Sequence, residues 1–242
     1  MSNSLAPKLL AELIGTFALV FIGAGAASIV GSAAGLGGIS AVAFAHGLTL
    51  MVFICAYGRV SGGHMNPAVT VGVLAVGAIS AAEAASYIVS QIVGGIAGAM
   101  LLRIVLGGVA TGLGTPELAH GLVLAGTPVT ITAEIGFIVE AVLAFFLVTV
   151  VLSTAVAGRA AHLAPVAIGL TLVFNILMGG PLTGAAFNPA RALGPMIVTG
   201  NLNDAWLYVL APIVGSIIAA VVHLGLSRLA DERPAAAAAP AE

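Results

Sequence analysis

The sequence predicts an all-α integral membrane protein with six transmembrane helices, two re-entrant half-helices and an inverted repeat of three spans. Of its 242 residues, 60% are hydrophobic and only 7% are charged, whereas a soluble domain carries about 25% charged residues. Six apolar runs are long enough to cross a bilayer, which takes about 20 residues. Two shorter segments begin with the same Asn-Pro-Ala motif, at Asn66 and Asn188.

The composition also excludes several classes of function. A net charge of −2 gives no reason to expect a nucleic-acid partner. Cys55 is the single cysteine, so an intrachain disulfide and a cysteine-based metal site are both excluded. The sequence has neither a metal-ligand spacing nor a nucleophile constellation. We therefore expect a protein that is not an enzyme and that binds no metal and no cofactor.

The apolar runs define the expected spans and the extent of the domain. They cover about residues 8–30, 39–58, 82–106, 131–157, 163–180 and 204–229. The first run exceeds the roughly 7–15 apolar residues of a signal-peptide core, so we interpret it as a span. One domain is expected over residues 1–230, with repeats at about 8–106 and 131–229. The Pro- and Ala-rich remainder, 231–242, is expected to be a disordered cytoplasmic tail.

The segments 66–77 and 188–198 are too short to span. At about 1.5 Å per residue, each covers about half of a hydrocarbon core of about 30 Å. Each opens with Asn at the expected N-cap and Pro at the first helical position, a favourable helix start. We therefore expect two half-helices, each preceded by a loop that dips into the membrane.

The chain repeats itself with a fixed offset. The segment His46–Leu50 matches Ile168–Leu172 at an offset of 122, and the same offset relates Asn66 to Asn188. Since each half has three spans, the second half must be inverted in the membrane. Inverted repeats with interrupted helices place their functional site near the bilayer midplane.

Basic residues predict the orientation of the spans. With the N-terminus inside, most of them fall on the cytoplasmic side, in agreement with the positive-inside rule. They are Lys8, Arg59, Arg159, Arg228 and Arg233. Both termini are then cytoplasmic, and a bacterial inner or plasma membrane is the expected location.

The two loops are expected to form a narrow aqueous path. Non-helical backbone is tolerated at membrane depth only where protein buries it or water wets it. Carbonyl groups of the small-residue stretches can then replace part of the hydrogen bonding of water. The expected carbonyls belong to Gly62, Gly63, His64 and Met65 in the first loop, and to Gly184, Ala185, Ala186 and Phe187 in the second.

Four polar side chains within the apolar segments have expected roles. Asn66 and Asn188 are expected to donate amide hydrogens to a permeant oxygen, besides capping their helices. The positive ends of the two half-helix dipoles would then exclude cations and protons. Glu12 and Glu140, related by an offset of 128, are expected to accept hydrogen bonds from the loops. The alternative for these carboxylates is proton coupling, because buried acids in membranes are usually functional.

These motifs resemble the major intrinsic protein family, the aquaporins. The resemblance covers nearly the whole chain except the tail and implies the aquaporin fold and a homotetramer with one pore in each protomer. Its motifs are the lead-in Ser61-Gly62-Gly63-His64, the triplets Asn66-Pro67-Ala68 and Asn188-Pro189-Ala190, Arg191, and the pair Glu12 and Glu140. The spacing of Gly94 and Gly98 suits close helix contacts of the kind an oligomer needs.

The resemblance also implies a selectivity filter of four residues, namely His46, Ile176, Ala185 and Arg191. Orthodox water channels have an aromatic residue and a histidine where this chain has His46 and Ile176. The pattern is similar to that of tonoplast-type and ammonia-permeable aquaporins. In the tonoplast subgroup, a loop histidine extends the filter, which implies that His120 could contact Arg191.

The expected function is a passive channel for water, with permeability to ammonia and hydrogen peroxide and exclusion of ions and protons. Its expected partners are these small neutral permeants and the lipid bilayer. One alternative is a glycerol or small-solute facilitator, although the filter has no aromatic residue and Ala192 stands where such facilitators usually have Asp. A second alternative is an ion-coupled secondary transporter built from inverted repeats.

Overall fold

The structure is a computed structural model that describes residues 4–30 and 35–237, with the side chains of 35–37, 124 and 230–237 excepted. Six helical spans are long and apolar enough to cross a membrane in this part of the chain. They are α1–η1–α2 (Leu5–Val30), α3 (Gly35–Ser61), α5 (Ala81–Val105), α6–η3 (Ala133–Val156), α7 (Ala164–Thr183) and α9 (Ala205–Ala237). The predicted six-span helical class is therefore confirmed.

Two spans contain a π-helical turn that was not predicted from the sequence. The first span consists of α1 (Leu5–Ala18), the π-helix η1 (Leu19–Ala24) and α2 (Gly25–Val30). The fourth consists of α6 (Ala133–Val151) and the π-helix η3 (Leu152–Val156). Such turns are rare and occur frequently at functional sites.

Between the spans lie the two half-helices, α4 (Pro67–Ala75) and α8 (Pro189–Thr199). The Asn66 side chain accepts a hydrogen bond from the amide of Ala68, and Asn188 accepts from Ala190 and Arg191. Each asparagine therefore caps its half-helix, in agreement with the preference of this residue for N-cap positions.

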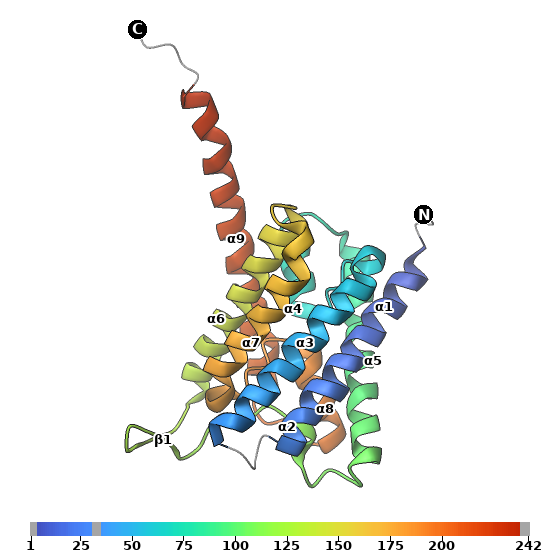
Figure 1. Cartoon of the computed structure of the whole chain (residues 1–242), viewed down its shortest axis with the longest axis vertical. Helices are drawn as coiled ribbons and strands as arrows, with labels where there is room; N and C mark the ends of the chain where they lie inside the picture. Colours follow the sequence, from blue (N-terminus) through green and yellow to red (C-terminus); the bar gives the residue numbers. More distant parts are fainter. Residues whose placement is uncertain (1–3, 31–34, 238–242) are drawn as a thin grey trace.

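Short elements in the connections complete the structure. They are the 3₁₀ helices η2 (Gly112–Gly114) and η4 (Ala161–Leu163) and the hairpin of β1 (Leu122–Leu124) and β2 (Thr127–Val129). In Figure 1, the N- and C-termini lie at one end of the bundle and the hairpin at the other. We call these ends the terminal side and the hairpin side.

The last helix is longer than the sequence predicts. Disorder is predicted for 231–242, but α9 continues to Ala237, and residues 238–242 lie outside the described part. In Figure 1 this helix projects beyond the other spans on the terminal side. The apolar pattern marks where the span ends, but it does not determine how far the helix continues beyond the apolar region.

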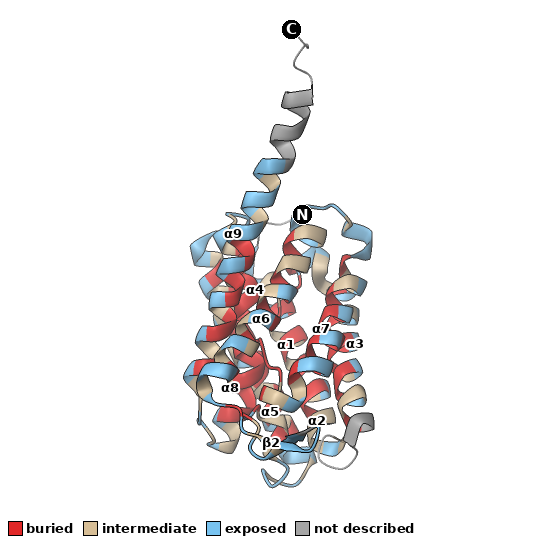
Figure 2. Ribbon diagram, turned by 90° about the vertical axis from the view of Figure 1, so that its left-hand side faces the viewer, coloured by how far each residue is buried: buried red, intermediate tan, exposed pale blue. Residues whose placement is uncertain are grey.

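Buried and exposed residues are distributed as a membrane protein requires. In Figure 2 the buried residues follow the inner faces of the helices, around the re-entrant segments. The outer faces expose large apolar side chains such as Val89, Ile104 and Val221. Lipid is the solvent that such faces need, because water would be unfavourable over so much apolar surface.

Glycines allow the helices of the two repeats to cross closely. Gly47 in α3 and Gly169 in α7 occupy equivalent positions, and a Cβ atom on either would lie 2.5–2.7 Å from the carbonyl oxygen of the other. Gly94 and Gly98 in α5 likewise pack on backbone atoms of Leu13 and Phe17 in the first span. The close contact expected of Gly94 and Gly98 thus lies within the protomer, where α5 crosses α1.

The equivalent crossing in the second repeat yields a prediction about stability. Gly215 in α9 lies against the carbonyl of Ala141 in α6, whereas Gly225 in the same helix has nothing within 4 Å of an added Cβ. We expect Gly215→Ala to lower the thermal unfolding temperature in detergent, because overpacking costs about 1–3 kcal/mol. Gly225→Ala should leave it unchanged or raise it slightly. Equal behaviour of the two variants would contradict this account of the helix crossing.

Candidate pore and its constrictions

A cavity runs between the two re-entrant loops in the centre of the bundle. Both motif asparagines and all four predicted filter residues line it. Much of the remaining wall is apolar. The spans contribute Leu19, Leu50, Ile54, Leu147, Val151, Ile168 and Leu172, and the half-helix α4 contributes Val69. A molecule inside this cavity therefore meets few groups that could hold it tightly.

A vestibule adjoins the central cavity at each end and shares lining residues with it. On the hairpin side, the vestibule shares Ile176 and Arg191 with the central cavity. On the terminal side, the vestibule shares Ile54, Gly62 and His64 with it. The three spaces follow one another along the bundle, with the filter residues toward the hairpin side, and we call this row of spaces the path.

The two asparagines join the loops to one another near the middle of the path. The Asn66 amide nitrogen donates to the Phe187 carbonyl at 3.0 Å, and the Asn188 amide nitrogen donates to the Met65 carbonyl at 2.9 Å. Because an amide nitrogen carries two hydrogens, each asparagine retains one further donor beside the cavity. These hydrogen bonds between the two loops were not predicted from the sequence.

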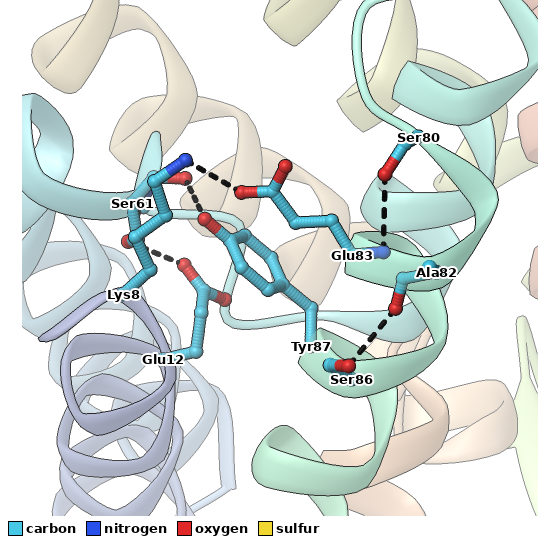
Figure 3. Close-up of polar contacts among 9 residues, drawn as sticks. Lys8, Glu12, Ser61, Ser80, Ala82, Glu83, Ser86 and Tyr87 are labelled. Atoms are coloured by element: carbon cyan, nitrogen blue, oxygen red, sulfur yellow. Dashed lines mark hydrogen bonds and ion pairs between the residues drawn. The ribbon is translucent and has the colours of Figure 1, made fainter. Parts of the chain in front are cut away.

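Glu12, in the first span, holds the first loop in place through hydrogen bonds. Its carboxylate accepts hydrogen bonds from the Ser61 hydroxyl at 2.6 Å, from the amide nitrogens of His64 and Met65 at 2.9 and 2.5 Å, and from the Gln91 side chain at 2.7 Å. Figure 3 shows Glu12 reaching Ser61 from the first span. The acid therefore supplies acceptors to loop backbone that no helix can satisfy.

Glu140 holds the second loop in the same way. It accepts hydrogen bonds from the Thr183 hydroxyl at 2.6 Å and from the amide nitrogens of Ala186 and Phe187 at 3.0 and 2.5 Å. Both carboxylates are fully buried. In each, both oxygens face donors, so a proton on either oxygen would displace a hydrogen bond.

Two tyrosines that were not predicted as site residues also hold the loops. The Tyr87 hydroxyl donates to the Ser61 carbonyl at 2.8 Å, and the Tyr208 hydroxyl donates to the Thr183 carbonyl at 2.7 Å. Figure 3 shows the first of these bonds beside the ion pair of Lys8 and Glu83. A signal for them exists in the sequence, because the two tyrosines occupy equivalent positions in the third spans of the two repeats.

The predicted lining carbonyls are not all in the same place. Gly62, Gly63, His64, Ala185 and Ala186 line the central cavity, whereas Gly184 lines the hairpin-side vestibule. The Met65 and Phe187 carbonyls accept hydrogen bonds from the opposite asparagines. The His64 ring packs edge-on against Tyr87 with centroids 5.3 Å apart, and its Nδ1 lies 3.1 Å from the Thr70 hydroxyl.

In the filter region, His46 has a defined tautomer. Its Nδ1 lies 2.9 Å from the Val42 carbonyl, and a carbonyl can only accept, so Nδ1 carries the hydrogen. The other ring nitrogen, Nε2, is buried and has no hydrogen-bond partner among the described residues. In the neutral ring that nitrogen is an acceptor, available to a molecule in the path.

Arg191 faces the same region and is held by a loop carbonyl. Its Nη1 donates to the Gly114 carbonyl at 2.9 Å, while its Nε is buried and has no hydrogen-bond partner in the part of the chain that the structure describes. His120 is exposed and lines a separate depression with Glu117 and Asp204. The expected contact of His120 with Arg191 is therefore not found in the described structure, and the loop residue that reaches Arg191 is Gly114.

The fold and the path define a class of protein: a membrane channel built from inverted three-span repeats around two re-entrant loops. Comparison with known proteins gives the family. The model of the major intrinsic protein family matches residues 1–223. The chain therefore belongs to the major intrinsic protein family.

Relatives of known sequence agree with this assignment. Aquaporin TIP4-4 of Zea mays is 41% identical over 224 residues, which cover 90% of this chain and 85% of that protein. Nodulin-26 of Glycine max is 36% identical over 217 residues, covering 89% and 76%. Among solved structures, the aquaglyceroporin from Plasmodium falciparum aligns with a TM-score of 0.77 at 22% identity, covering 90% of this chain and 94% of that one.

Membership in the family establishes the general function. The protein is a multi-pass membrane channel for water and small solutes, and it is not an enzyme. The similarity to the aquaglyceroporin, at 22% identity, concerns the fold alone. The relatives named above come from plants, so they give no support to the expectation of a bacterial membrane.

Proposed function

We propose that this channel conducts water and ammonia, with hydrogen peroxide as a further permeant, and excludes ions and protons. One observation carries the proposal: His46, Ile176, Ala185 and Arg191 line a single cavity together with both motif asparagines. This set consists of two polar and two aliphatic residues, and none of the four is aromatic.

The polar groups of the filter suit molecules that both donate and accept hydrogen bonds. His46 offers an acceptor at Nε2, and Arg191 offers guanidinium donors with a fixed positive charge. Ammonia, water and hydrogen peroxide can use both, whereas a cation meets the charge of Arg191 and loses its hydration. The aliphatic side chains of Ile176 and Ala185 add no further polar group to the filter that would select for water alone.

The asparagine pair supports exclusion of protons. Each has one amide hydrogen left beside the path, because its other hydrogen is used across the loops. A water molecule whose oxygen accepts from both cannot also accept from a neighbouring water there. The half-helix dipoles place positive potential at the same point, which opposes cations.

The structure gives no support to the alternative of a proton-coupled transporter. Glu12 and Glu140 lie behind the loops and use both carboxylate oxygens as acceptors for loop donors. A proton would have to displace one of these bonds in every cycle. A glycerol facilitator remains the second candidate, and measured glycerol flux decides it.

We propose further that both termini are cytoplasmic and that the protein is a homotetramer. The orientation is supported by the basic residues, since Lys8 and Arg59 lie on the terminal side and Arg103 lies toward the hairpin side. The tetramer is supported by family membership. Protease access to a tagged terminus in intact cells tests the first, and native mass spectrometry in detergent tests the second.

Parallel flux measurements on proteoliposomes test the function. We expect faster osmotic shrinkage than in empty liposomes, faster internal alkalinisation on addition of ammonium salts, and entry of hydrogen peroxide, with glycerol uptake close to background. The uptake should be non-saturating and independent of a proton gradient. Unchanged water flux with correctly folded protein would disprove the water function, and glycerol flux comparable to ammonia flux would favour the facilitator.

A further inference from the structure

The π-helix η1, at Leu19–Ala24, lies beside the filter without contributing one of its four residues. Two of its members, Gly23 and Ala24, are buried. Each packs against a different part of the filter, Gly23 against a filter side chain and Ala24 against the loop that holds Arg191. Gly23 and Ala24 therefore contact the surroundings of both polar filter residues, His46 and Arg191.

Gly23 contacts the ring of His46. A Cβ atom on Gly23 would overlap the His46 ring, with Nε2 at 2.6 Å and Cγ at 2.7 Å. The ring is also bonded to the Val42 carbonyl and faces the central cavity. Because the cavity is the open space beside it, a larger residue at position 23 would displace the ring into the path.

Ala24 contacts the loop that holds Arg191. A Cβ atom on Gly114 would lie 2.5 Å from the Ala24 carbonyl oxygen and 2.8 Å from its Cα. The Gly114 carbonyl accepts the hydrogen bond from Arg191. The loop is further fixed by Leu113, which is fully buried in a cluster with Val20, Ala24, Ala99 and Leu102. The distance between loop and π-turn thus sets where the guanidinium is held.

The inverted repeat provides an internal comparison. At the repeat offsets, Gly23 corresponds to Val151 and His46 to Ile168. On the terminal side, Val151 and Ile168 both line the path as large apolar side chains. On the filter side, the equivalent of Val151 is Gly23, which has no side chain, and the equivalent of Ile168 is His46, which has an imidazole ring. The glycine is therefore paired with the histidine and is not a general feature of the repeat.

We propose that the π-turn at Gly23 and Ala24 is a specificity-determining element that positions His46 and Arg191. Gly23 holds the imidazole ring out of the path, and Ala24 sets the position of the Gly114 carbonyl and so of the guanidinium. These are positioning residues, since both act through a filter residue. The inference rests on the proposed filter, and it concerns water flux as well as ammonia flux.

A double-mutant cycle tests the Gly23 arm in proteoliposomes. We expect Gly23→Ala to reduce water and ammonia permeability several-fold, because the displaced ring narrows the path. In a His46→Ala background the same substitution should have no effect, since the ring is absent. Gly25→Ala is the matched control in the same span, because its Cβ would meet only the flexible end of Leu102, at 3.0 Å.

A second cycle tests the Ala24 arm. Gly114→Ala should change the ratio of ammonia to water permeability several-fold, and this change should vanish in an Arg191→Ala background. Gly121→Ala is the control. Gly121 has a φ of 72°, similar to the 67° of Gly114, but an added Cβ would have no atom of the described residues within 4 Å. The control carries the same backbone strain without the contact.

The outcomes separate the two proposals. Wild-type protein that conducts water but no ammonia would overturn the proposed selectivity, while both cycles could still be measured on water flux. If Gly23→Ala lowers flux equally with and without His46, the positioning role is wrong. Flux unchanged by both Gly23→Ala and Gly114→Ala would overturn the inference entirely. Should Gly23→Ala fail to fold alone, the double variant with His46→Ala is expected to fold, and its failure would likewise contradict the proposal.

Discussion

Replacing Glu140 of α6 by glutamine is expected to lower the free energy of unfolding of the protein by about 1–3 kcal/mol. The carboxylate accepts from Thr183, Ala186 and Phe187. A glutamine has one acceptor oxygen and one donor nitrogen, so whichever way it is placed, a loop amide faces another donor. An unsatisfied buried donor costs about 1–3 kcal/mol.

The measurement is thermal unfolding in detergent, followed by the fluorescence of Trp206. This tryptophan stacks on Phe137 of α6, with ring centroids 6.2 Å apart, and so reports on the helix that carries Glu140. Glu134→Gln is the matched control, because Glu134 lies in the same helix but is exposed. We expect a clear decrease in unfolding temperature for Glu140→Gln and little change for the control.

The same variant, Glu140→Gln, distinguishes a structural role of Glu140 in holding the second loop from a role in proton-coupled transport. If Glu140 only anchors the loop, Glu140→Gln should lower stability and flux without making the remaining flux depend on a proton gradient. Full stability combined with loss of a proton-dependent component would instead support the transporter alternative. Glu140→Leu, which removes every acceptor, should be more severe than the glutamine variant.

The second large expected effect is a change in the ratio of ammonia flux to water flux when filter residues are replaced. The double substitution His46→Phe with Ile176→His should reduce ammonia flux more than water flux. The phenyl ring removes the Nε2 acceptor, and the new histidine adds a polar wall where Ile176 now lies. Losing one hydrogen bond of about 1 kcal/mol for one permeant corresponds to about a fivefold change in the flux ratio.

Stopped-flow measurements on the same proteoliposome preparations give this ratio directly. Leu48→Phe is a suitable control, since it adds a phenyl ring to α3 at an exposed position that faces away from the path. Equal losses of ammonia and water flux in the double variant would show that these two positions do not determine selectivity.

Much of the fold follows from local features of the sequence. Length and hydropathy define the six spans, and the Asn-Pro starts define the half-helices at Asn66 and Asn188. These features are reliable because a bilayer requires apolar length and internal backbone hydrogen bonding in every span. The end of α9 at Ala237 is a different case, since helix formation beyond the membrane depends on no such requirement.

The candidate site is only partly predictable. The repeat offsets place Glu12 and Glu140 near the loops, but their donors become clear only when the loops are folded back onto the spans. His120 is a different case. The resemblance to the tonoplast subgroup implies a contact with Arg191, whereas in the described structure His120 is exposed and the Gly114 carbonyl accepts the hydrogen bond from Arg191.

By itself, the sequence determined the class of protein and its inverted repeat, because these depend on composition and spacing. The candidate filter residues came from the resemblance of its motifs to the family. Only the tertiary structure decided how these residues are held. The cross-loop bonds of Asn66 and Asn188, the tautomer of His46 and the contact of Gly23 with its ring each join segments distant in the chain. Such contacts depend on the packing of whole helices, which no local pattern encodes.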